Sequence, residues 1–328
     1  MLSNKTMMLS GRVTDYFYID LVGRCMQVGK HFWGWVLLFV SFVWGIEFSL
    51  IHNALDFMGP NTFNTVRFGV AIVVLQFYFT VTKFSFIACI DKETIHHGIV
   101  LGSLLFLGFS TQTVGMQYTT VSNAGFITGL NVVLVPIISW LWLKQLQRWY
   151  VWLGVAMALG GTLLLTGGIS GFGVGETWVL GCAFGFAAHI VYTGVYARQV
   201  NPLALTQVQL ITVTIFSLLT SMIFEQDSLV NVPNSLFGNG FSEGAITIWL
   251  AVIIGSVLGT CLAFVAQTIG QQTLAAWRVA LIYATEPLFA ALGGFLLLGE
   301  VLGFYAWLGA AFIIGGMLVA ELIEDKKE

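Results

Sequence analysis

Apolar residues fill this chain in long runs, and the polar residues gather between the runs. A helix rises 1.5 Å per residue, so about 20 apolar residues cross a hydrocarbon core of roughly 30 Å. Ten runs reach this length. We expect each to form an unbroken helix, because most of the five prolines lie near the ends of the runs. The expected spans are residues 32–53, 60–82, 95–117, 121–143, 150–167, 177–198, 202–224, 246–269, 274–298 and 304–323. The pattern therefore predicts an all-α polytopic membrane protein with ten transmembrane helices.

The composition excludes several other classes of protein. Only 9% of the residues are charged and 57% are hydrophobic, whereas a soluble domain carries about 25% charged residues. The net charge of −3 leaves no basic patch for nucleic acid. The four cysteines are scattered without the spacing of a metal site or a disulfide framework, so we expect neither a metal nor a cofactor. The chain has no HExxH, GxSxG or Walker motif, which argues against an enzyme.

Lysine and arginine lie on one side of the expected spans. If the N-terminus is cytoplasmic, every loop cation falls in the cytoplasm and the five external loops carry none. The positive-inside rule therefore favours cytoplasmic N- and C-termini. Residues 1–31 lack the apolar stretch of a signal peptide, so we expect a cytoplasmic N-terminal tail there and a cytoplasmic C-terminal tail at 324–328. We expect the plasma membrane, which is the inner membrane in a Gram-negative source.

The chain also repeats itself. A shift of 142 residues aligns Pro60 with Pro202, and a shift of 155 aligns the segment Tyr150 to Gly154 with Tyr305 to Gly309. The first repeat would cover residues 32–168 and the second 176–323. Each repeat holds five spans, which is an odd number, so the two repeats would insert with opposite orientation. Inverted repeats with a site near the midplane are a transporter architecture.

Several motifs resemble those of the EamA family of the drug/metabolite transporter superfamily. They are Phe42-Val43-Trp44-Gly45, Pro60 with Arg67, Asn123-Ala124-Gly125-Phe126, Glu286 to Ala291 followed by Leu297-Leu298-Gly299-Glu300, and Trp307 to Ala311. One departure is Lys144-Gln145, where many members have Gly-Glu. The resemblance spans residues 32–323. It implies ten helices, a central cavity and transport of small metabolites, often outward.

Four ionisable residues stand out inside the expected spans, where a charge is costly and therefore a candidate for function. Glu47 and Arg67 lie at similar depth in the outer half of the membrane, whereas His189 and Glu286 lie near the midplane. The repeat places His189 opposite Glu47 and Asn131 opposite Glu286. Glu47, Asn131, His189 and Glu286 would then form a polar ring at the centre.

Each member of this ring also has a structural interpretation. Arg67 would neutralise Glu47 in a structural ion pair that locks two helices. Glu286 precedes Pro287 and would serve local helix geometry. His189 would bond a backbone carbonyl, and Asn131 would join two helices. Only Glu286 has no cation at its depth other than a protonated His189, so Glu286 is our candidate for proton coupling.

Three further residues are candidates for substrate binding. Ten of the eleven tryptophans lie near span ends, as interfacial residues do, whereas Trp44 lies deep and one turn before Glu47. Trp44 would form an aromatic wall of the cavity or simply pack. Gln207 and Gln267 are uncharged hydrogen-bonding groups within spans.

The pattern as a whole favours a secondary transporter, in the exporting direction, of a small polar organic metabolite such as an amino acid or an amine. A channel or facilitative pore for small solutes is the alternative, since polar groups in a bundle also line pores. The expected partners are the substrate, a coupled proton and the lipid bilayer. We expect a monomer or a homodimer.

The orientation is testable by labelling introduced cysteines. Cysteines at position 57 and in the 230–240 loop should react with a membrane-impermeant reagent from outside, and one at position 146 should not. External labelling at position 146 would overturn the orientation.

Overall fold

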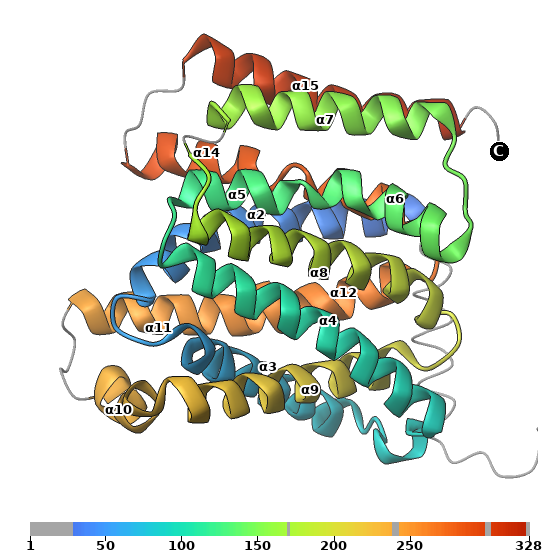
Figure 1. Ribbon diagram of the computed structural model, residues 1–328. Coiled ribbons are helices and arrows are strands. Elements are labelled where there is room, and N and C mark those ends of the chain that lie inside the picture. Colours follow the sequence, from blue (N-terminus) through green and yellow to red (C-terminus); the bar gives the residue numbers. More distant parts are fainter. Residues whose placement is uncertain (1–28, 169–170, 238–242, 299–302, 326–328) are drawn as a thin grey trace, which may run out of the picture.

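The computed structural model describes residues 29–168, 171–237, 243–298 and 303–325. Nearly all of residues 1–31 and most of 324–328, where we expect the two tails, lie outside the described residues. The described chain is helical throughout (Figure 1). Its elements are α2 (Lys30–Ala54), α3 (Pro60–Thr82), η1 (Ile87–Cys89), α4 (Lys92–Met116), α5 (Val121–Gly129), α6 (Asn131–Leu143), α7 (Trp149–Thr166), α8 (Val174–Tyr196), α9 (Pro202–Phe224), α10 (Gln226–Phe237), α11 (Glu243–Ser256), η2 (Val257–Leu262), α12 (Ala263–Gly270), α13 (Ala276–Tyr283), α14 (Glu286–Leu298) and α15 (Phe304–Asp325).

The long helices begin where the sequence supplies a cap or a proline. Pro60 and Pro202 open α3 and α9, where a proline leaves no hydrogen bond unmade. The Asp91 side chain accepts a hydrogen bond from the backbone N–H of Thr94, 2.7 Å away, at the start of α4. That bond lowers the pKa of Asp91, a group outside the membrane-spanning segments. The helix boundaries thus follow local chemistry that the sequence displays.

Nine helical stretches among the described residues are long and apolar enough to cross a membrane. They match nine of the ten expected spans. In the expected span at 274–298 the structure instead has two short helices, α13 and α14, with a break at Ala284 and Thr285. Pro287 explains the position of the break, because it cannot donate the hydrogen bond that the carbonyl of Tyr283 would receive in a continuous helix.

Two more expected spans each form one helix long enough to cross a membrane, but neither is uniform, so the expectation of an unbroken helix fails outright only for the span at 274–298. The span at 121–143 is interrupted at Leu130, between α5 and α6. The span at 246–269 changes from α-helix to a π-helix over η2, and then returns to α-helix in α12. All three irregularities lie near the middle of their spans.

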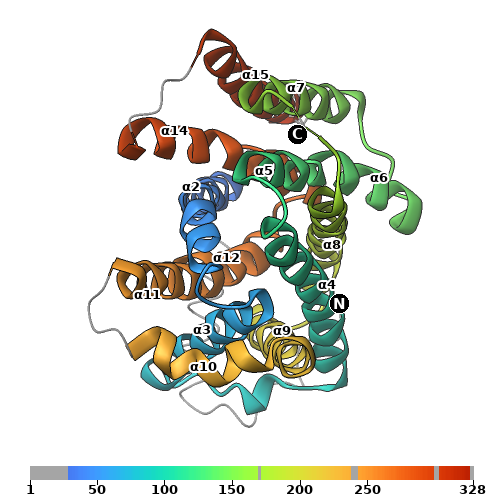
Figure 2. The same cartoon turned by 60° about the vertical axis from the view of Figure 1, so that its left-hand side comes forward.

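The helices form a bundle in which α7 and α15 pack side by side at one edge and α3, α9 and α10 lie at the opposite edge (Figures 1 and 2). Glycines allow the close approach of α7 and α15. A Cβ atom on Gly161 would lie 2.6 Å from the carbonyl oxygen of Gly309, and one on Gly154 would lie 2.9 Å from that of Gly316. Between these edges lie α2, α8 and α12 (Figures 1 and 2).

Candidate substrate pocket at the centre of the bundle

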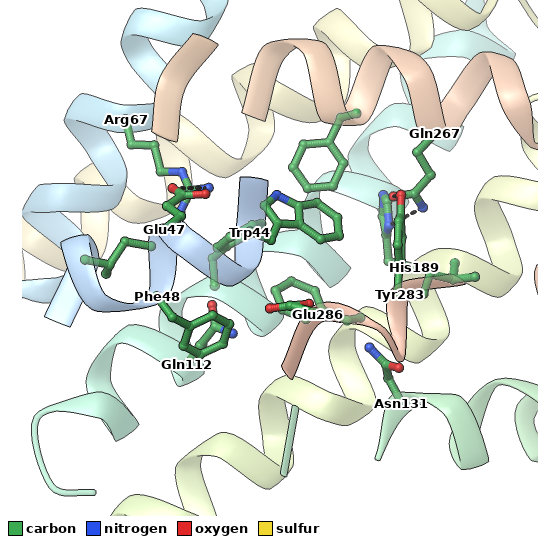
Figure 3. A pocket seen from close by; sticks show the side chains of 15 residues that line it. Trp44, Glu47, Phe48, Arg67, Gln112, Asn131, His189, Gln267, Tyr283 and Glu286 are labelled. Carbon is green, nitrogen blue, oxygen red and sulfur yellow. Dashed lines mark hydrogen bonds and ion pairs between the residues drawn. The ribbon is translucent and has the colours of Figure 1, made fainter. Parts of the chain in front are cut away.

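A pocket lies at the centre of the bundle and receives side chains from helices of both halves of the chain (Figure 3). Six of the seven residues proposed from the sequence for substrate binding line it. These are Trp44, Glu47, Asn131, His189, Gln267 and Glu286. The seventh, Gln207, is buried in α9 and is not among the lining residues. Two of the irregular points, just before Asn131 and just before Glu286, thus lie at a polar pocket.

Glu47 and Arg67 form a buried ion pair at one side of this pocket. The Arg67 Nη2 atom lies 2.8 Å from Glu47 Oε1, and both side chains are at most 2% exposed. Arg67 also donates from Nε to Thr260 Oγ1 at 2.7 Å and from Nη2 to the carbonyl oxygen of Gly259 at 3.3 Å. The pair therefore joins α2, α3 and η2 at a single point.

The end of α11 and the π-helix η2 provide the space and the acceptor that this ion pair needs. Gly255 and Gly259 face Glu47, and a Cβ atom on either glycine would collide with the carboxylate oxygens. The carbonyl of Gly259 accepts from Arg67 and, at 2.8 Å, from the indole Nε1 of Trp44. Trp44, on the wall of the pocket, is thereby held in place.

His189 belongs to an uncharged hydrogen-bonded network on the opposite side of the pocket. Its Nε2 lies 2.9 Å from Gln209 Oε1, and its Nδ1 lies 3.4 Å from Gln267 Nε2. Because an amide nitrogen can only donate, Nδ1 acts as the acceptor, and Nε2 carries the proton in this arrangement. The Tyr283 hydroxyl donates to Gln267 Oε1 at 3.2 Å. These contacts hold His189 as a neutral imidazole.

The two polar pairs occupy equivalent positions of the sequence repeat. The shift of 142 residues carries Glu47 to His189 and Arg67 to Gln209. In the structure, Glu47 contacts Arg67 and His189 contacts Gln209. The first half of the chain therefore has a charged pair, and the second half a neutral pair, at positions that this shift aligns.

Glu286 and Asn131 stand at the first positions of the half-helices α14 and α6. The structure records no hydrogen bond or ion pair to the Glu286 carboxylate within the described residues, and this side chain is half-buried at the pocket. The Oδ1 atom of Asn131 is buried and accepts no hydrogen bond. Figure 3 shows the Glu286 carboxylate near the centre of the labelled side chains. These two repeat-related positions thus place polar side chains with unpartnered atoms at the pocket.

The sequence did not single out most of the apolar lining. Phe48, Ile51, Phe109, Phe186, Ile190 and Phe264 surround the polar groups, together with Tyr283 and Gln112. The ring of Trp44 meets that of Tyr283 at 4.7 Å between centroids. Aromatic residues are too frequent in these helices to mark a pocket by themselves. Only the sequence position of Tyr283 could have indicated it, because Tyr283 lies three residues, about one helical turn, before Glu286. No group of three or more potential metal ligands occurs among the described residues.

The fold and the pocket define a polytopic helical membrane protein with a polar site at its centre. The profile of the EamA-like transporter family matches the chain twice, over residues 31–167 and 173–321. The chain belongs to this family.

Known proteins that resemble the chain agree with this assignment. An uncharacterized transporter of Archaeoglobus fulgidus is 32% identical over 87% of this chain and 84% of its own length. The uncharacterized transporter YyaM of Bacillus subtilis is 24% identical, over 87% of this chain and 92% of its own length. A crystal structure with 19% identical residues superposes with a TM-score of 0.70 over 89% of this chain and 97% of that chain, which shows the shared fold. The family and the named relatives make this chain a membrane transporter rather than an enzyme.

The buried ion pair predicts that removing one charge destabilises the protein more than removing both. Glu47→Gln leaves the Arg67 charge unpaired in the bundle, which should cost about 3–5 kcal/mol. The double variant Glu47→Gln/Arg67→Met removes both charges and should recover most of that loss. The measurement is the unfolding midpoint of the purified protein in detergent. Arg148→Met, at an exposed cation, serves as the control and should change little. A double variant less stable than Glu47→Gln would contradict this account.

Proposed function

We propose that the protein is a secondary transporter that exports a small polar organic metabolite, such as an amino acid or an amine, by alternating access around the central pocket. The observation that carries this proposal is the pocket itself. Two half-helices begin there with polar side chains that lack partners, and aromatic side chains enclose them. Discontinuous helices that open at a midplane site are typical of secondary transporters. The substrate would supply the partners that Glu286 and Asn131 lack.

We further propose ten membrane-spanning helices in two inverted five-helix repeats, with α13 and α14 together forming the ninth. Three observations support this arrangement. The family profile matches the chain twice, the polar pairs recur at equivalent positions, and the helix breaks at Leu130 and Ala284 lie next to the repeat-related residues Asn131 and Glu286. The loop cations support cytoplasmic termini in the plasma membrane. The oligomeric state that we propose is a monomer or a homodimer.

Glu286 would couple transport to protons. A carboxylate without a partner in a low-dielectric bundle has to bind a proton or a cation. Glu47 is paired with Arg67 and His189 is bonded to two amides, so neither is as free to exchange as Glu286. Competition between a proton and a cationic group of the substrate for Glu286 would then give antiport.

A channel would use the same polar lining but would behave differently. A carrier saturates and shows counterflow, in which unlabelled substrate loaded on one side drives uptake of labelled substrate from the other. A channel shows unitary currents instead. Counterflow in proteoliposomes, with candidate metabolites as substrates, therefore tests the proposed function directly, and unitary currents without counterflow would refute it.

Variants of the pocket should impair counterflow without unfolding the protein. Trp44→Ala, Asn131→Ala and His189→Ala remove the aromatic wall, an unpartnered acceptor and the centre of the neutral network. We expect each to reduce saturable uptake about tenfold or more, while the protein stays monodisperse. Asn64→Ala is the matched control, because Asn64 is also buried with an unpartnered Oδ1 but lies outside the pocket. Normal uptake by all three pocket variants would make these residues structural.

If Glu286 binds the coupled proton, a Glu286→Gln variant should lose pH-driven accumulation of substrate while it keeps substrate exchange at equal pH. A vesicle lumen more acidic than the bath should drive accumulation in the parent protein, because protons leave as substrate enters. Glu286→Gln mimics the protonated side chain and should abolish this accumulation. Substrate exchange at equal pH would persist if the amide still binds substrate. Both are measured as uptake of labelled substrate into proteoliposomes. Accumulation by Glu286→Gln with the parent's dependence on pH would show that Glu286 is not the proton site.

A further inference from the structure

Two glutamines at repeat-equivalent positions line the pocket. The shift of 155 residues carries Gln112 to Gln267 and Thr128 to Tyr283. In the structure, Gln112 Nε2 donates to Thr128 Oγ1 at 3.3 Å, and the Tyr283 hydroxyl donates to Gln267 Oε1 at 3.2 Å. Each glutamine thus bonds the half-helix, α5 or α13, that precedes a break in its span.

The two glutamines lie toward opposite ends of the bundle, because α4 and α12 run in opposite directions (Figure 1). We call the end at which α12 ends and α13 begins the inner end, and the end at which α4 ends and α5 begins the outer end. In the orientation proposed above, the inner end is cytoplasmic and the outer end is external. A transporter that works by alternating access has to open these two ends in turn.

At the inner end, the hydrogen bonds continue from the pocket wall to α8. Gln267 Nε2 donates to Gln271 Oε1 at 3.0 Å, and Gln271 Nε2 donates to the carbonyl oxygen of Ile190 at 2.8 Å. Neither glutamine is more than 1% exposed, and Ile190 lines the pocket. We call this chain of bonds the Gln271 bridge. It joins the end of α12 to α8 next to the pocket.

The repeat places no such bridge at the outer end. The shift of 155 residues carries Met116 to Gln271, and the shift of 142 carries Phe48 to Ile190. A thioether has no N–H group, so Met116 cannot donate to the carbonyl of Phe48 as Gln271 donates to that of Ile190. Met116 is 1% exposed and belongs to the same buried apolar cluster as Phe48. The outer end is therefore held at this point by apolar packing, which is not directional.

The helix opposite Gln271 also differs between the two halves. A Cβ atom on Gly194 of α8 would lie 3.4 Å from Gln271 Nε2, so the amide lies against a face of α8 that carries no side chain at this residue. The equivalent residue on α2 is His52, which carries an imidazole. Both the glutamine and the glycine that faces it thus occur only in the second half.

Other polar contacts of the two ends balance one another better. Asn123 and Arg278 are aligned by the shift of 155 residues. At the outer end Asn123 Nδ2 donates to Glu176 Oε1 at 3.0 Å, and at the inner end Arg278 Nη2 donates to Glu324 Oε2 at 2.7 Å. Each end thus has a contact between the first turn of a half-helix and an acidic side chain. The Gln271 bridge is additional to this contact, and it starts from the pocket itself.

We infer from this asymmetry that Gln271 is a positioning residue that holds the inner end of the pocket closed, so that the pocket opens more readily at the outer end. The inference rests on the proposed alternating-access function and names a residue that biases it. Opening the inner end separates α12 from α8 and breaks both bonds of Gln271, which leaves buried polar groups without partners. At the equivalent point of the outer end, opening separates only the apolar side chain of Met116 from α2.

Access to the pocket from each side tests this inference. Ile51 lines the pocket, so Ile51→Cys serves as the reporter in the full chain with its four native cysteines replaced by alanine. Right-side-out and inside-out membrane vesicles present the outer and the inner end to a membrane-impermeant maleimide. Gln271→Met keeps a side chain of similar shape without the amide. We expect it to raise the labelling rate from the inner side about fivefold or more, and not the rate from the outer side.

Two further variants separate the bridge from general damage to the bundle. Gln207→Met changes a buried glutamine of α9 that lies outside the pocket, and it should leave both labelling rates unchanged. Gly194→Val crowds the Gln271 amide from the side of α8 and should raise labelling from the inner side as Gln271→Met does. A single symmetric peak in size-exclusion chromatography shows that a variant is folded. Because these two variants break the bridge from different helices, loss of folding in one leaves the other as the test.

Three results would overturn the inference. The first is an unchanged rate of labelling from the inner side in Gln271→Met. The second is an equal rise from both sides, which would indicate loosened packing instead of an opened inner end. The third is a folded Gly194→Val variant that labels like the parent. Counterflow by the parent protein in any of these cases would leave the transporter proposal standing, whereas unitary currents without counterflow would refute that proposal instead.

Discussion

A guanidinium group buried inside a membrane bundle has to be paired, and this constraint organises the centre of the protein. Arg67 meets Glu47, and the pair leaves no room for a Cβ atom on Gly255 or Gly259. The chain accordingly has glycine at both positions. The π-helical turn at η2 then offers the carbonyl of Gly259 to Arg67 and to Trp44. A single electrostatic requirement thus sets the packing of α2 and α3 against η2 and the position of one wall of the pocket.

The second half of the chain solves the same geometric problem without charge. His189 and Gln209 stand where the repeat places Glu47 and Arg67, and they make a neutral hydrogen bond across the equivalent pair of helices, α8 and α9. A neutral pair avoids the desolvation cost of two ions. Both pairs are neutral overall, so neither places a counter-charge beside Glu286.

The sequence predicted the parts of this arrangement that depend on depth and register. Counting positions along the spans placed Glu47 near Arg67, and the repeat placed Asn131 opposite Glu286. It could not predict which way a side chain faces within an all-apolar helix, because lipid and core select similar residues. For this reason the sequence could not distinguish Gln207 from Gln267 as a pocket residue, and in the structure only Gln267 lines the pocket. The π-turn was not predictable either, because rearranged backbone hydrogen bonds depend on tertiary partners, whereas the break at Ala284 follows from Pro287, which the sequence displays.

The break between α13 and α14 is held by hydrogen bonds that do not involve Glu286. Thr285 donates to the carbonyl of Ile282 at 2.6 Å, and its hydroxyl lies 3.0 Å from that of Ser41 on α2. These bonds give partners to the carbonyl of Ile282 and to both hydroxyl groups, at a point where an interrupted helix leaves backbone groups unbonded. Tyr283, on the other side of the break, is bonded to Gln267. Because its neighbours are bonded to one another, the carboxylate of Glu286 is not used to complete the break, which is consistent with the exchange role that we propose for it.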